Sequence, residues 1–453
     1  MIISQDCVNY KLSRFTRVIH KEDRMYVFNS LTGLKAKIVD SILINQLSEL
    51  EKGSILSEID GRLLSTKICV PCNIDEEVIA STRAYNYLTS NYSSLRLIIL
   101  PTRECNFRCV YCYEDKRKEY MSDETENALV DATIDYLQNY KICKSLMLEW
   151  FGGEPLLCKA TIVRIAKRLK AYCDENDVFF SMSMTTNGYL LDIETARVLS
   201  ELNLISYQIT IDGNESNHNQ LRALKNGGKT WATIYHNLLA IKESEIKNVK
   251  IRIRINYHAE LLDTITPFLE QLKTDFNDTR FGIFMIKINP PVDKDLPYTF
   301  ISDKAEILTQ DYIFDLFSNE QIGIDEYLAN INPFAPICYA RQNSVLVIDV
   351  DGTIRKCTEY LEDNSYNNIG TISGGKFNIN NDLHMQWLMP PNDLLEARKC
   401  RDCSDMPICL GGVCPAQWFR EKRISCNMFH LLVGKMLEIY FSERDPANEK
   451  NNS

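Results

Sequence analysis

The spacing of hydrophobic residues changes back and forth along the middle of the chain. Six apolar runs of strand length alternate with stretches whose apolar residues recur at helical spacing. Alternating strands and helices are typical of a parallel α/β sheet, so residues 91–290 are predicted to form six β/α units. Six units do not close an eightfold barrel, and we expect a partial (β/α)6 barrel that is open on one side. The six runs are residues 95–100, 145–151, 178–185, 204–211, 249–256 and 280–288.

A separate module is predicted before this barrel, at residues 1–90. It contains two strand candidates, 14–20 and 25–31, joined by a polar turn. Three stretches with helical spacing follow them. These three stretches are residues 38–50, 54–64 and 75–91.

In the barrel, Ser122 is the predicted N-cap of the helix that follows the first strand, because acidic residues and a helical apolar pattern come directly after it.

The pattern changes again after the barrel. Residues 291–336 are predicted to bridge to a third domain and contain one helix candidate, 303–317. The third domain, residues 337–443, begins with a predicted hairpin around Asp351 and Gly352 and ends with an apolar helix. Residues 444–453 are polar, and we expect them to be disordered.

Charge and composition exclude several classes of protein. The formal net charge is -10, whereas proteins that bind nucleic-acid backbones carry a basic surface. No apolar stretch has the length of a membrane span or the form of a secretion signal, so a cytoplasmic location is expected. In a reducing compartment, 16 cysteines are better explained by metal binding or catalysis than by disulfide bonds.

Three of these cysteines lie in one short loop after the first apolar run. Cys105, Cys109 and Cys112 have a spacing that lets their thiolates bind three irons of a 4Fe-4S cluster and leaves the fourth iron open. A structural zinc loop or three unrelated buried thiols are the alternatives. The loop resembles that of the radical S-adenosylmethionine (SAM) enzymes, in which the open iron binds SAM and the three cysteines serve catalysis.

The resemblance extends to the ends of the following strands. Gly152, Gly153 and Glu154 match the family's GGE motif, which holds the amino group of SAM. Thr210 matches a position that contacts SAM, in a strand-four segment similar to that of peptide and protein maturases. The cofactor-binding residues that the resemblance implies are Tyr111, Gly152, Gly153, Glu154, Asn187, Thr210 and Arg254.

Other polar residues near the predicted strand ends have more than one explanation. Asp212 and Arg222 either serve the site or form an ion pair that orders a loop. Arg252, Arg254 and Asn256 alternate along the fifth run and therefore face one side of the strand. One of the two arginines is expected to hold the SAM carboxylate, with Arg254 as the candidate.

A second set of cysteines follows in the third domain. Its spacing resembles that of the SPASM domain, whose seven cysteines hold two auxiliary 4Fe-4S clusters. The ligands implied for one cluster are Cys400, Cys403, Cys409 and Cys426. The ligands implied for the other are Cys338, Cys357 and Cys414. This second set has only three thiolates, so one of its irons is open to a substrate thiolate, unless a distant cysteine such as Cys158 or Cys173, or water, fills the place.

The order of the N-terminal elements resembles the winged-helix-like domain that binds leader peptides in systems that make modified ribosomal peptides; a plain cap on the barrel is the alternative. These resemblances imply SAM, three 4Fe-4S clusters and a radical that takes hydrogen from carbon. We therefore expect a radical SAM/SPASM maturase of the sactipeptide or ranthipeptide type, which forms thioether bridges. Its expected partners are a Cys-containing precursor peptide with a leader and an external electron donor of the flavodoxin or ferredoxin type.

Three other functions stay open. An anaerobic sulfatase maturase, which forms formylglycine, is similar through most of the barrel but carries an Asp directly after its equivalent of Cys357. This chain has Thr358 there, followed by Glu359. A carbon-carbon crosslinking maturase fits the same motifs. A non-catalytic iron-sulfur electron carrier would have no use for the GGE and strand-four residues.

Overall fold

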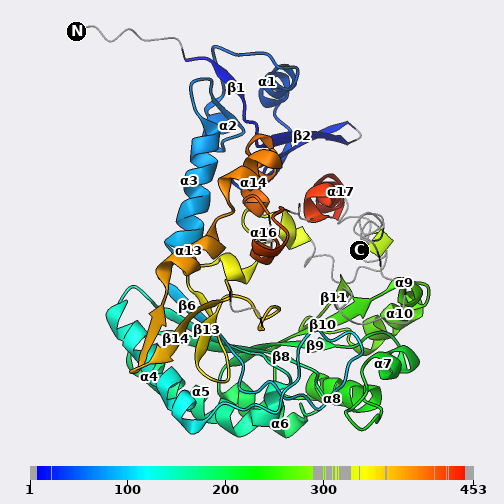
Figure 1. Cartoon of the computed structure of the whole chain (residues 1–453). Coiled ribbons are helices and arrows are strands. Elements are labelled where there is room, and N and C mark those ends of the chain that lie inside the picture. The colour runs from blue at the N-terminus through cyan, green and yellow to red at the C-terminus, as the bar shows by residue number, and fades with distance from the viewer. Residues whose placement is uncertain are drawn as a thin grey trace. The chain divides into compact units, whose positions relative to one another are not determined.

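The computed structural model of the chain describes residues 8–21, 23–288, 299, 301, 309, 312, 313, 315, 328–335, 337–362, 365–412, 414–424, 426 and 428–443 (Figure 1). The chain divides into two units. The barrel unit comprises residues 91–323 and 342–388, and the terminal unit comprises residues 1–90, 324–341 and 389–453. The predicted tail at 444–453 lies outside the described residues, as does the predicted helix at 303–317 apart from four of its positions.

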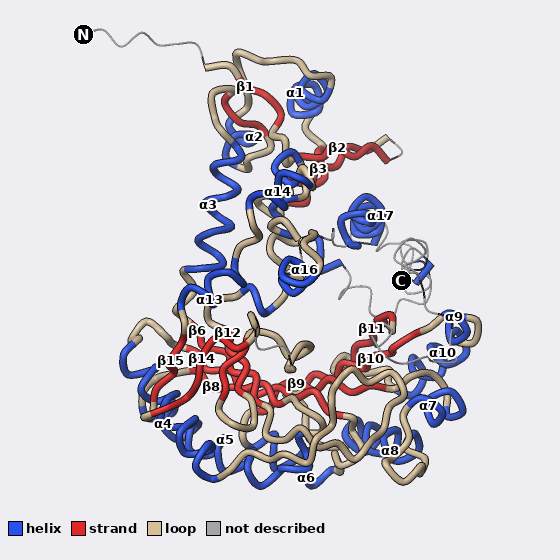
Figure 2. The backbone as a smooth tube through the Cα atoms, in the orientation of Figure 1, coloured by secondary structure: helices blue, strands red, loops and turns tan. Residues whose placement is uncertain are grey.

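Six consecutive parallel strands form the centre of the barrel unit. All six predicted runs are strands, and the predicted α/β class with a large, mostly parallel sheet is confirmed (Figure 2). Ile251, Ile253 and Ile255 show why: these β-branched residues alternate along β10 and are fully buried. The strands are β6 (Ser94–Ile99), β7 (Ser145–Trp150), β8 (Phe179–Thr186), β9 (Leu204–Thr210), β10 (Lys250–Tyr257) and β11 (Phe281–Lys287).

Helices connect these strands and cover one face of the sheet (Figures 1 and 2). Ser122 caps α4 as predicted, because its side chain accepts a 3.1 Å hydrogen bond from the amide of Thr125. Asp192 caps α6 in the same way, with a 2.7 Å bond from the amide of Thr195. The helices are α4 (Asp123–Asn139), η1 (Pro155–Cys158), α5 (Lys159–Glu175), α6 (Ile193–Glu201), α7 (Glu215–Leu221), α8 (Trp231–Glu243), α9 (Ala259–Leu262) and α10 (Ile265–Asp275).

Residues 342–388 extend the barrel sheet beyond β6. β12 (Val345–Ile348) pairs with β6 in parallel, and every residue of β12 is buried, as in a central strand. β13 (Thr353–Arg355), β14 (Asn368–Ser373) and β15 (Lys376–Ile379) then add antiparallel strands, and α13 (Asn381–Leu388) follows. The predicted hairpin around Asp351 and Gly352 is therefore present, as β12 and β13, and it belongs to the ten-stranded sheet of the barrel unit.

The N-terminal part of the terminal unit contains both predicted strands, and the stretches predicted at 38–50 and 75–91 are helices. The prediction of a helix over 54–64 is wrong for most of that stretch, because only Gly61–Ser65 is helical and Leu56 forms a β-bridge with Tyr10. The three-stranded antiparallel sheet of this part packs a core that includes Val27, Leu47 and Leu63. The elements are β1 (Tyr10–Leu12), β2 (Thr16–Lys21), β3 (Arg24–Asn29), β4 (Leu34–Ile38), α1 (Ser41–Glu51), α2 (Gly61–Ser65), β5 (Cys69–Pro71) and α3 (Glu76–Thr89). β1, β4 and β5 were not predicted, because strands of three to five residues carry little periodicity.

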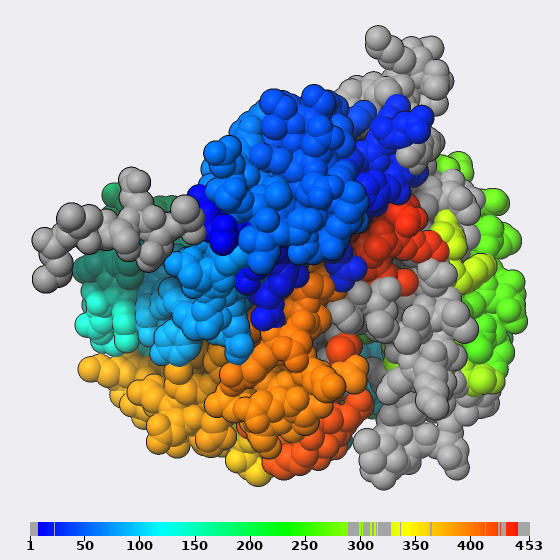
Figure 3. All heavy atoms as spheres, turned by 90° about the horizontal axis from the view of Figure 1, so that it is seen from above, coloured from blue at the N-terminus to red at the C-terminus, as the bar shows by residue number. Residues whose placement is uncertain are grey.

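The C-terminal segment of the terminal unit packs against this N-terminal part (Figure 3). Arg17 forms an ion pair with Asp405, and Arg401 Nη1 lies 3.0 Å from Glu77 Oε1. The predicted apolar helix is present as α17. The elements are η2 (Ala329–Ile331), η3 (Tyr339–Arg341), α14 (Asn392–Ala397), η4 (Cys400–Asp402), α15 (Met406–Cys409), α16 (Pro415–Arg420) and α17 (Met428–Glu443). Among the described helices of both units, none is long and apolar enough to cross a membrane.

Candidate active site

The loop that carries Cys105, Cys109 and Cys112 begins at the carboxyl end of β6, the edge where barrel enzymes of this kind place their chemistry. Burial raises the pKa of the Cys105 thiol to about 12, and the neighbouring Cys109 adds to that rise. Burial also raises the pKa of Cys112, again with a contribution from Cys109. Cys109 therefore lies close enough to each of the other two thiols to act on it electrostatically.

The surroundings of this loop fit an iron-sulfur cluster. Burial lowers the pKa of Lys116, but the charges of the three cysteines outweigh burial and raise it overall, so a cation faces the thiols. The amide of Phe107 donates to Cys105 Sγ at 3.4 Å. In the described part of the chain, no three His, Cys, Asp or Glu side chains are placed to share one metal ion. A cluster makes a different demand, because each thiolate binds its own iron.

Gly152 and Gly153 follow β7 and touch the backbone of the cysteine loop. A Cβ atom on Gly152, whose φ is +116°, would lie 2.4 Å from the carbonyl oxygen of Thr102. On Gly153 it would lie 2.2 Å from the carbonyl oxygen of Glu104. The amide of Glu154 donates to the same carbonyl of Glu104 at 2.9 Å. Both positions therefore require glycine because the backbone of the preceding loop passes so close to them. From the sequence we expected a bound ligand to be the reason.

The Glu154 carboxylate joins the ends of β7 and β8. It is fully buried and accepts hydrogen bonds from the amide of Asn187 at 2.8 Å and from Thr186 Oγ1 at 2.7 Å. The amide of Leu156 donates to it as well, at 3.0 Å. Burial raises the pKa of this carboxyl, and these donors act against that rise. Glu154 therefore braces the site through its side chain.

Asn187 continues this brace to the cysteine loop. Its Nδ2 donates to Asn106 Oδ1 at 2.8 Å and lies 4.0 Å from Cys105 Sγ. The side chain is 7% exposed. The brace thus runs from Glu154 through Asn187 to the first cysteine, and it links three strand ends that are far apart in sequence.

Tyr111 is the centre of a buried network on the other side of the loop. Its hydroxyl donates to Asp212 and accepts hydrogen bonds from Arg222 Nη1 at 2.7 Å and from Asn256 Nδ2 at 2.9 Å. The amide of Asn256 also donates to Asp212, at 2.8 Å. Asp212 and Arg222 therefore order a loop, which was one of the two explanations left open. Sequence reasoning did not connect Tyr111 with these residues, since Asp212 follows β9, Asn256 lies on β10 and Arg222 follows α7.

Three further polar groups face this end of the sheet. Thr210 is 8% exposed and is paired with Arg254 in the β9–β10 register. Arg254 Nε donates to Asn256 Oδ1 at 2.8 Å. Arg222 Nε has no hydrogen-bond partner within the described residues. A buried donor of this kind costs free energy unless another group accepts a hydrogen bond from it, and an oxygen atom of a bound cofactor is one group that can do so.

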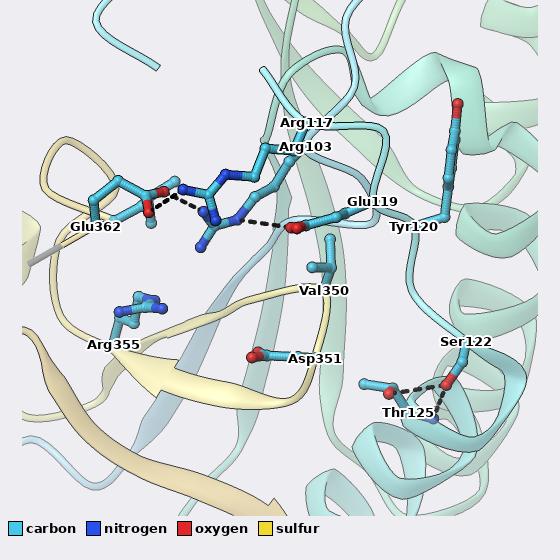
Figure 4. Close-up of a pocket in the computed structure, with 11 residues that line it drawn as sticks. Arg103, Arg117, Glu119, Tyr120, Ser122, Thr125, Val350, Asp351, Arg355 and Glu362 are labelled. Atoms are coloured by element: carbon cyan, nitrogen blue, oxygen red, sulfur yellow. Dashed lines mark hydrogen bonds and ion pairs between the residues drawn. The ribbon is translucent and has the colours of Figure 1, made fainter. Parts of the chain in front are cut away.

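An open pocket of about 630 Å³ lies beside the cysteine loop, between the start of α4 and the β12–β13 hairpin (Figure 4). Glu362 pairs with both Arg103 and Arg117 at its rim. Arg103 also pairs with Asp349, which is fully buried and accepts a 2.8 Å hydrogen bond from Arg355 Nε. This network ties the segment before Cys105 to the strands that extend the sheet. Sequence reasoning missed it.

The cysteines expected to hold auxiliary clusters divide between the two units. Cys357 belongs to the barrel unit, where the amide of Glu359 donates to its Sγ at 3.4 Å. The other six cysteines belong to the terminal unit. Four of them act on one another electrostatically, since the three others contribute to the raised pKa of Cys400, which burial chiefly causes. Those four are Cys400, Cys403, Cys409 and Cys426, the set that sequence reasoning assigned to one cluster.

Comparisons with known proteins agree with this geometry. Residues 99–256 match the model of the Radical SAM superfamily. The chain is 21% identical to the radical SAM cyclopropyl synthase TigE of Paramaledivibacter caminithermalis, over 94% of this chain and 95% of that protein. It is 25% identical to a serine-type anaerobic sulfatase-maturating enzyme of Klebsiella aerogenes, over 69% and 77% of the two chains.

A solved structure shares the fold. Native anSMEcpe with bound AdoMet and Kp18Cys peptide superposes with a TM-score of 0.60 at 20% identity, covering 80% of this chain and 100% of that one. A radical SAM domain implies SAM and a 4Fe-4S cluster, which the cysteine loop fits. Residues 99–256 are thus a radical SAM domain.

Proposed function

We propose that this chain modifies a ribosomally made precursor peptide by joining a cysteine sulfur of the peptide to one of its carbon atoms. The observation that carries the proposal is the braced cysteine loop, which Glu154 and Asn187 hold at the carboxyl end of β6. The substrate class is supported by the relatives, since one matures sulfatases and the structural neighbour binds a peptide. With its cluster and SAM in place, such a site supplies a 5'-deoxyadenosyl radical.

The residues of the chain position this chemistry. Thr210, Arg254 and the main chain of Gly152 and Gly153 are proposed to contact SAM, with Tyr111 and Asn187 beside them. Because the Glu154 carboxylate and the Tyr111 hydroxyl already have protein partners, we infer that these two groups fix the loop. The radical removes one hydrogen from a substrate carbon. Coupling of that carbon to a thiolate then releases one electron, so each bridge costs the peptide two hydrogens overall.

The ligand set that the sequence resemblance assigns to Cys338, Cys357 and Cys414 is our reason for proposing thioether formation in particular. Such a set would provide three thiolates, and a substrate thiolate is a suitable fourth ligand for an open iron. Such an iron would bind the sulfur that is to be coupled. The auxiliary clusters would supply the redox chemistry that takes up the released electron, and an external acceptor would reoxidise them.

The three-stranded sheet of the terminal unit supports leader binding. β3 lies between β2 and β4, so each outer strand has one strand partner among the described residues. An extended leader can pair with such an edge through main-chain hydrogen bonds. We propose that residues 1–90 bind the leader in this way, so a core peptide without its leader is a poorer substrate.

Formylglycine formation is the second candidate, and the match to a sulfatase-maturating enzyme favours it. The residue after Cys357 is Thr358, which is 8% exposed and has no acidic group. Glu359 is the next acid along the chain and is exposed. If the chain forms formylglycine, we propose Glu359 as the proton acceptor, so Glu359→Gln is expected to abolish the reaction. Thioether formation does not need this acid.

The experiment is anaerobic turnover of a Cys-rich precursor peptide encoded beside the gene, with reconstituted enzyme, SAM and reductant. The product mass is recorded after free thiols are alkylated. A loss of two hydrogens and one reactive thiol per site supports thioether formation. Loss of sulfur identifies formylglycine made from cysteine. Loss of two hydrogens with every thiol still reactive identifies formylglycine made from serine if the product reacts with a hydrazide, and otherwise a bond between carbon atoms, such as the ring that a cyclopropyl synthase makes.

A further inference from the structure

Arg398 lies at the C-terminal end of α14 and points its guanidinium at a cysteine sulfur. Its Nε lies 3.3 Å and its Nη2 lies 3.1 Å from Cys426 Sγ, so two N–H groups on the same edge of the fork donate to one atom. Lys399, the next residue, adopts left-handed backbone with φ +55° and turns the chain into η4, which begins at Cys400. The turn thus places Arg398 directly before the cysteine set.

The other members of the set lie around the same point. Cys400 packs in a small core with Trp418 and Ile424. Its raised pKa, which burial causes first, also reflects Cys409, Cys426 and Cys403, so the four sulfurs share one neighbourhood. Four thiolates of this kind form the complete ligand set of a 4Fe-4S cluster.

A second cation holds the loop that presents Cys409. Arg341 is fully buried, and its guanidinium donates to the carbonyl oxygens of Cys409 at 3.1 Å, Leu410 at 3.0 Å and Gly412 at 2.5 Å. Trp418 lies 5.0 Å from the same guanidinium. Arg341 thus fixes the loop from its inner side, while Arg398 approaches the set from the exposed side.

One acid works in the opposite direction. Asp405 adds to the raised pKa of Cys403, which burial chiefly causes, but the carboxylate is paired with Arg17. Arg398, which acts on Cys400, and Arg341, which acts on Cys409, add positive charge beside these sulfurs. Donors and positive charge near cysteine ligands favour the reduced state of a cluster, because reduction adds negative charge that is spread onto the sulfurs.

We propose that Arg398 raises the reduction potential of the auxiliary cluster held by Cys400, Cys403, Cys409 and Cys426, and so makes that cluster the favoured acceptor of the electron released by substrate coupling. The inference rests on the proposed function for the source of the electron. Its geometric content, the fork of Arg398 on a ligating sulfur, stands without it. Arg398 acts through Cys426 and is a positioning residue for the reaction.

The test uses the full-length chain with Cys105, Cys109 and Cys112 replaced by alanine, so that only auxiliary clusters are reconstituted. Iron content and the reduction midpoint of each cluster are measured by redox titration followed by electron paramagnetic resonance. Cys400→Ala identifies which signal belongs to the proposed set. Arg401→Gln is the matched control, because Arg401 is three residues further on and contacts Glu77 and Asn392.

Arg398→Gln is expected to lower the midpoint of the signal that Cys400→Ala removes. At a fixed potential the ratio of reduced to oxidised cluster should fall at least tenfold, which corresponds to about 59 mV for one electron. Arg401→Gln is expected to leave the midpoint unchanged. Equal midpoints in the two variants, or a shift in the other signal, would overturn the inference alone. A parent protein that binds no auxiliary iron would overturn it together with the cluster assignment.

Arg398→Lys covers the case in which Arg398→Gln fails to bind iron. It keeps the positive charge but loses the two-donor fork, so its midpoint should lie below that of the parent protein. A midpoint equal to the parent value would contradict the role assigned to the fork. Peptide turnover is measured separately, on the parent protein that keeps Cys105, Cys109 and Cys112. If that protein forms no thioether while the midpoints behave as expected, the result counts against the proposed function only.

Discussion

The carboxylate of Glu154 accepts a 2.8 Å hydrogen bond from the main-chain amide of Asn187, and this bond joins the ends of β7 and β8. Asn187 in turn contacts Asn106 within the cysteine loop. The GGE motif therefore acts on the cluster site through contacts within the protein. Three strand ends are thus joined through hydrogen bonds among buried polar groups.

Glu154→Gln should weaken this brace. The amide keeps one acceptor oxygen but presents N–H groups to donors, which leaves at least one buried donor without a partner. We expect the free energy of unfolding to fall by about 1–3 kcal/mol and SAM affinity to fall about tenfold. Urea denaturation and equilibrium SAM binding measure the two effects. Glu201→Gln, at an exposed position on α6, is the control, and a similar loss in both variants would contradict the brace.

Gly153→Ala should prevent assembly of the cluster in the cysteine loop. The added Cβ would lie 2.2 Å from a main-chain oxygen of Glu104, which cannot move without displacing the segment that leads into Cys105. The variant is expected to reconstitute with about one 4Fe-4S cluster fewer than the parent. Iron and sulfide analysis measures this. Gly61→Ala, with open space around the new Cβ, should keep the full content, and normal iron in Gly153→Ala would refute the packing argument.

Tyr111→Phe should loosen the loop without removing a ligand. It deletes the hydroxyl that bonds Asp212, Arg222 and Asn256, so buried polar groups lose a partner at a cost of about 1–3 kcal/mol. We expect normal iron content, weaker SAM binding and more SAM cleavage that is not coupled to substrate. Liquid chromatography measures the amounts of 5'-deoxyadenosine and of modified peptide, and their ratio reports the coupling. Tyr85→Phe, an exposed tyrosine, should keep the parent ratio, and an unchanged ratio in Tyr111→Phe would be inconsistent with this role.

The barrel unit should lose stability below about pH 6.5. Burial lowers the pKa of His384 to about 3, helped by the charge of Lys356, so the folded chain keeps this imidazole neutral. The unfolded chain binds a proton at the ordinary histidine pKa of about 6.5. Unfolding therefore takes up a proton between those two values, and stability is full above pH 6.5 and falls as pH drops through the window.

His384→Gln should remove this contribution. Its free energy of unfolding should decline less steeply than that of the parent between pH 6 and pH 5, by up to about 1.4 kcal/mol per pH unit. His218, whose pKa burial and Arg222 also lower, continues to contribute in both proteins. Urea unfolding at several pH values gives the two slopes. His236→Gln, which changes a surface histidine, should match the parent, and parallel slopes for His384→Gln would disprove the assignment.

The sequence predicted those parts of the fold that depend on local pattern. The run at residues 249–256 became β10 because alternating isoleucines bury one face, and Ser122 caps α4 because its neighbours suit a helix start. The cysteine loop and the GGE motif were found because their spacing is specific. The radical SAM domain that they indicated is confirmed by the family match at residues 99–256.

Long-range contacts could not be predicted in this way. β12 pairs with β6 across a long stretch of chain, and nothing in the apolar run at residues 345–348 says which strand it will join. The need for glycine at position 153 was likewise assigned to a ligand, because the path of the Glu104 carbonyl is a property of the tertiary fold. The domain boundaries, the site assignments and the number of auxiliary clusters stay predictions.

The most direct measurement follows a single hydrogen atom. A precursor peptide carrying deuterium at the carbon that becomes crosslinked is turned over with SAM, and 5'-deoxyadenosine is analysed by mass spectrometry. We expect one deuterium per bridge to appear in 5'-deoxyadenosine while the peptide loses one thiol. Modified peptide whose 5'-deoxyadenosine contains no deuterium, or labelled 5'-deoxyadenosine with every thiol intact, would contradict radical thioether formation.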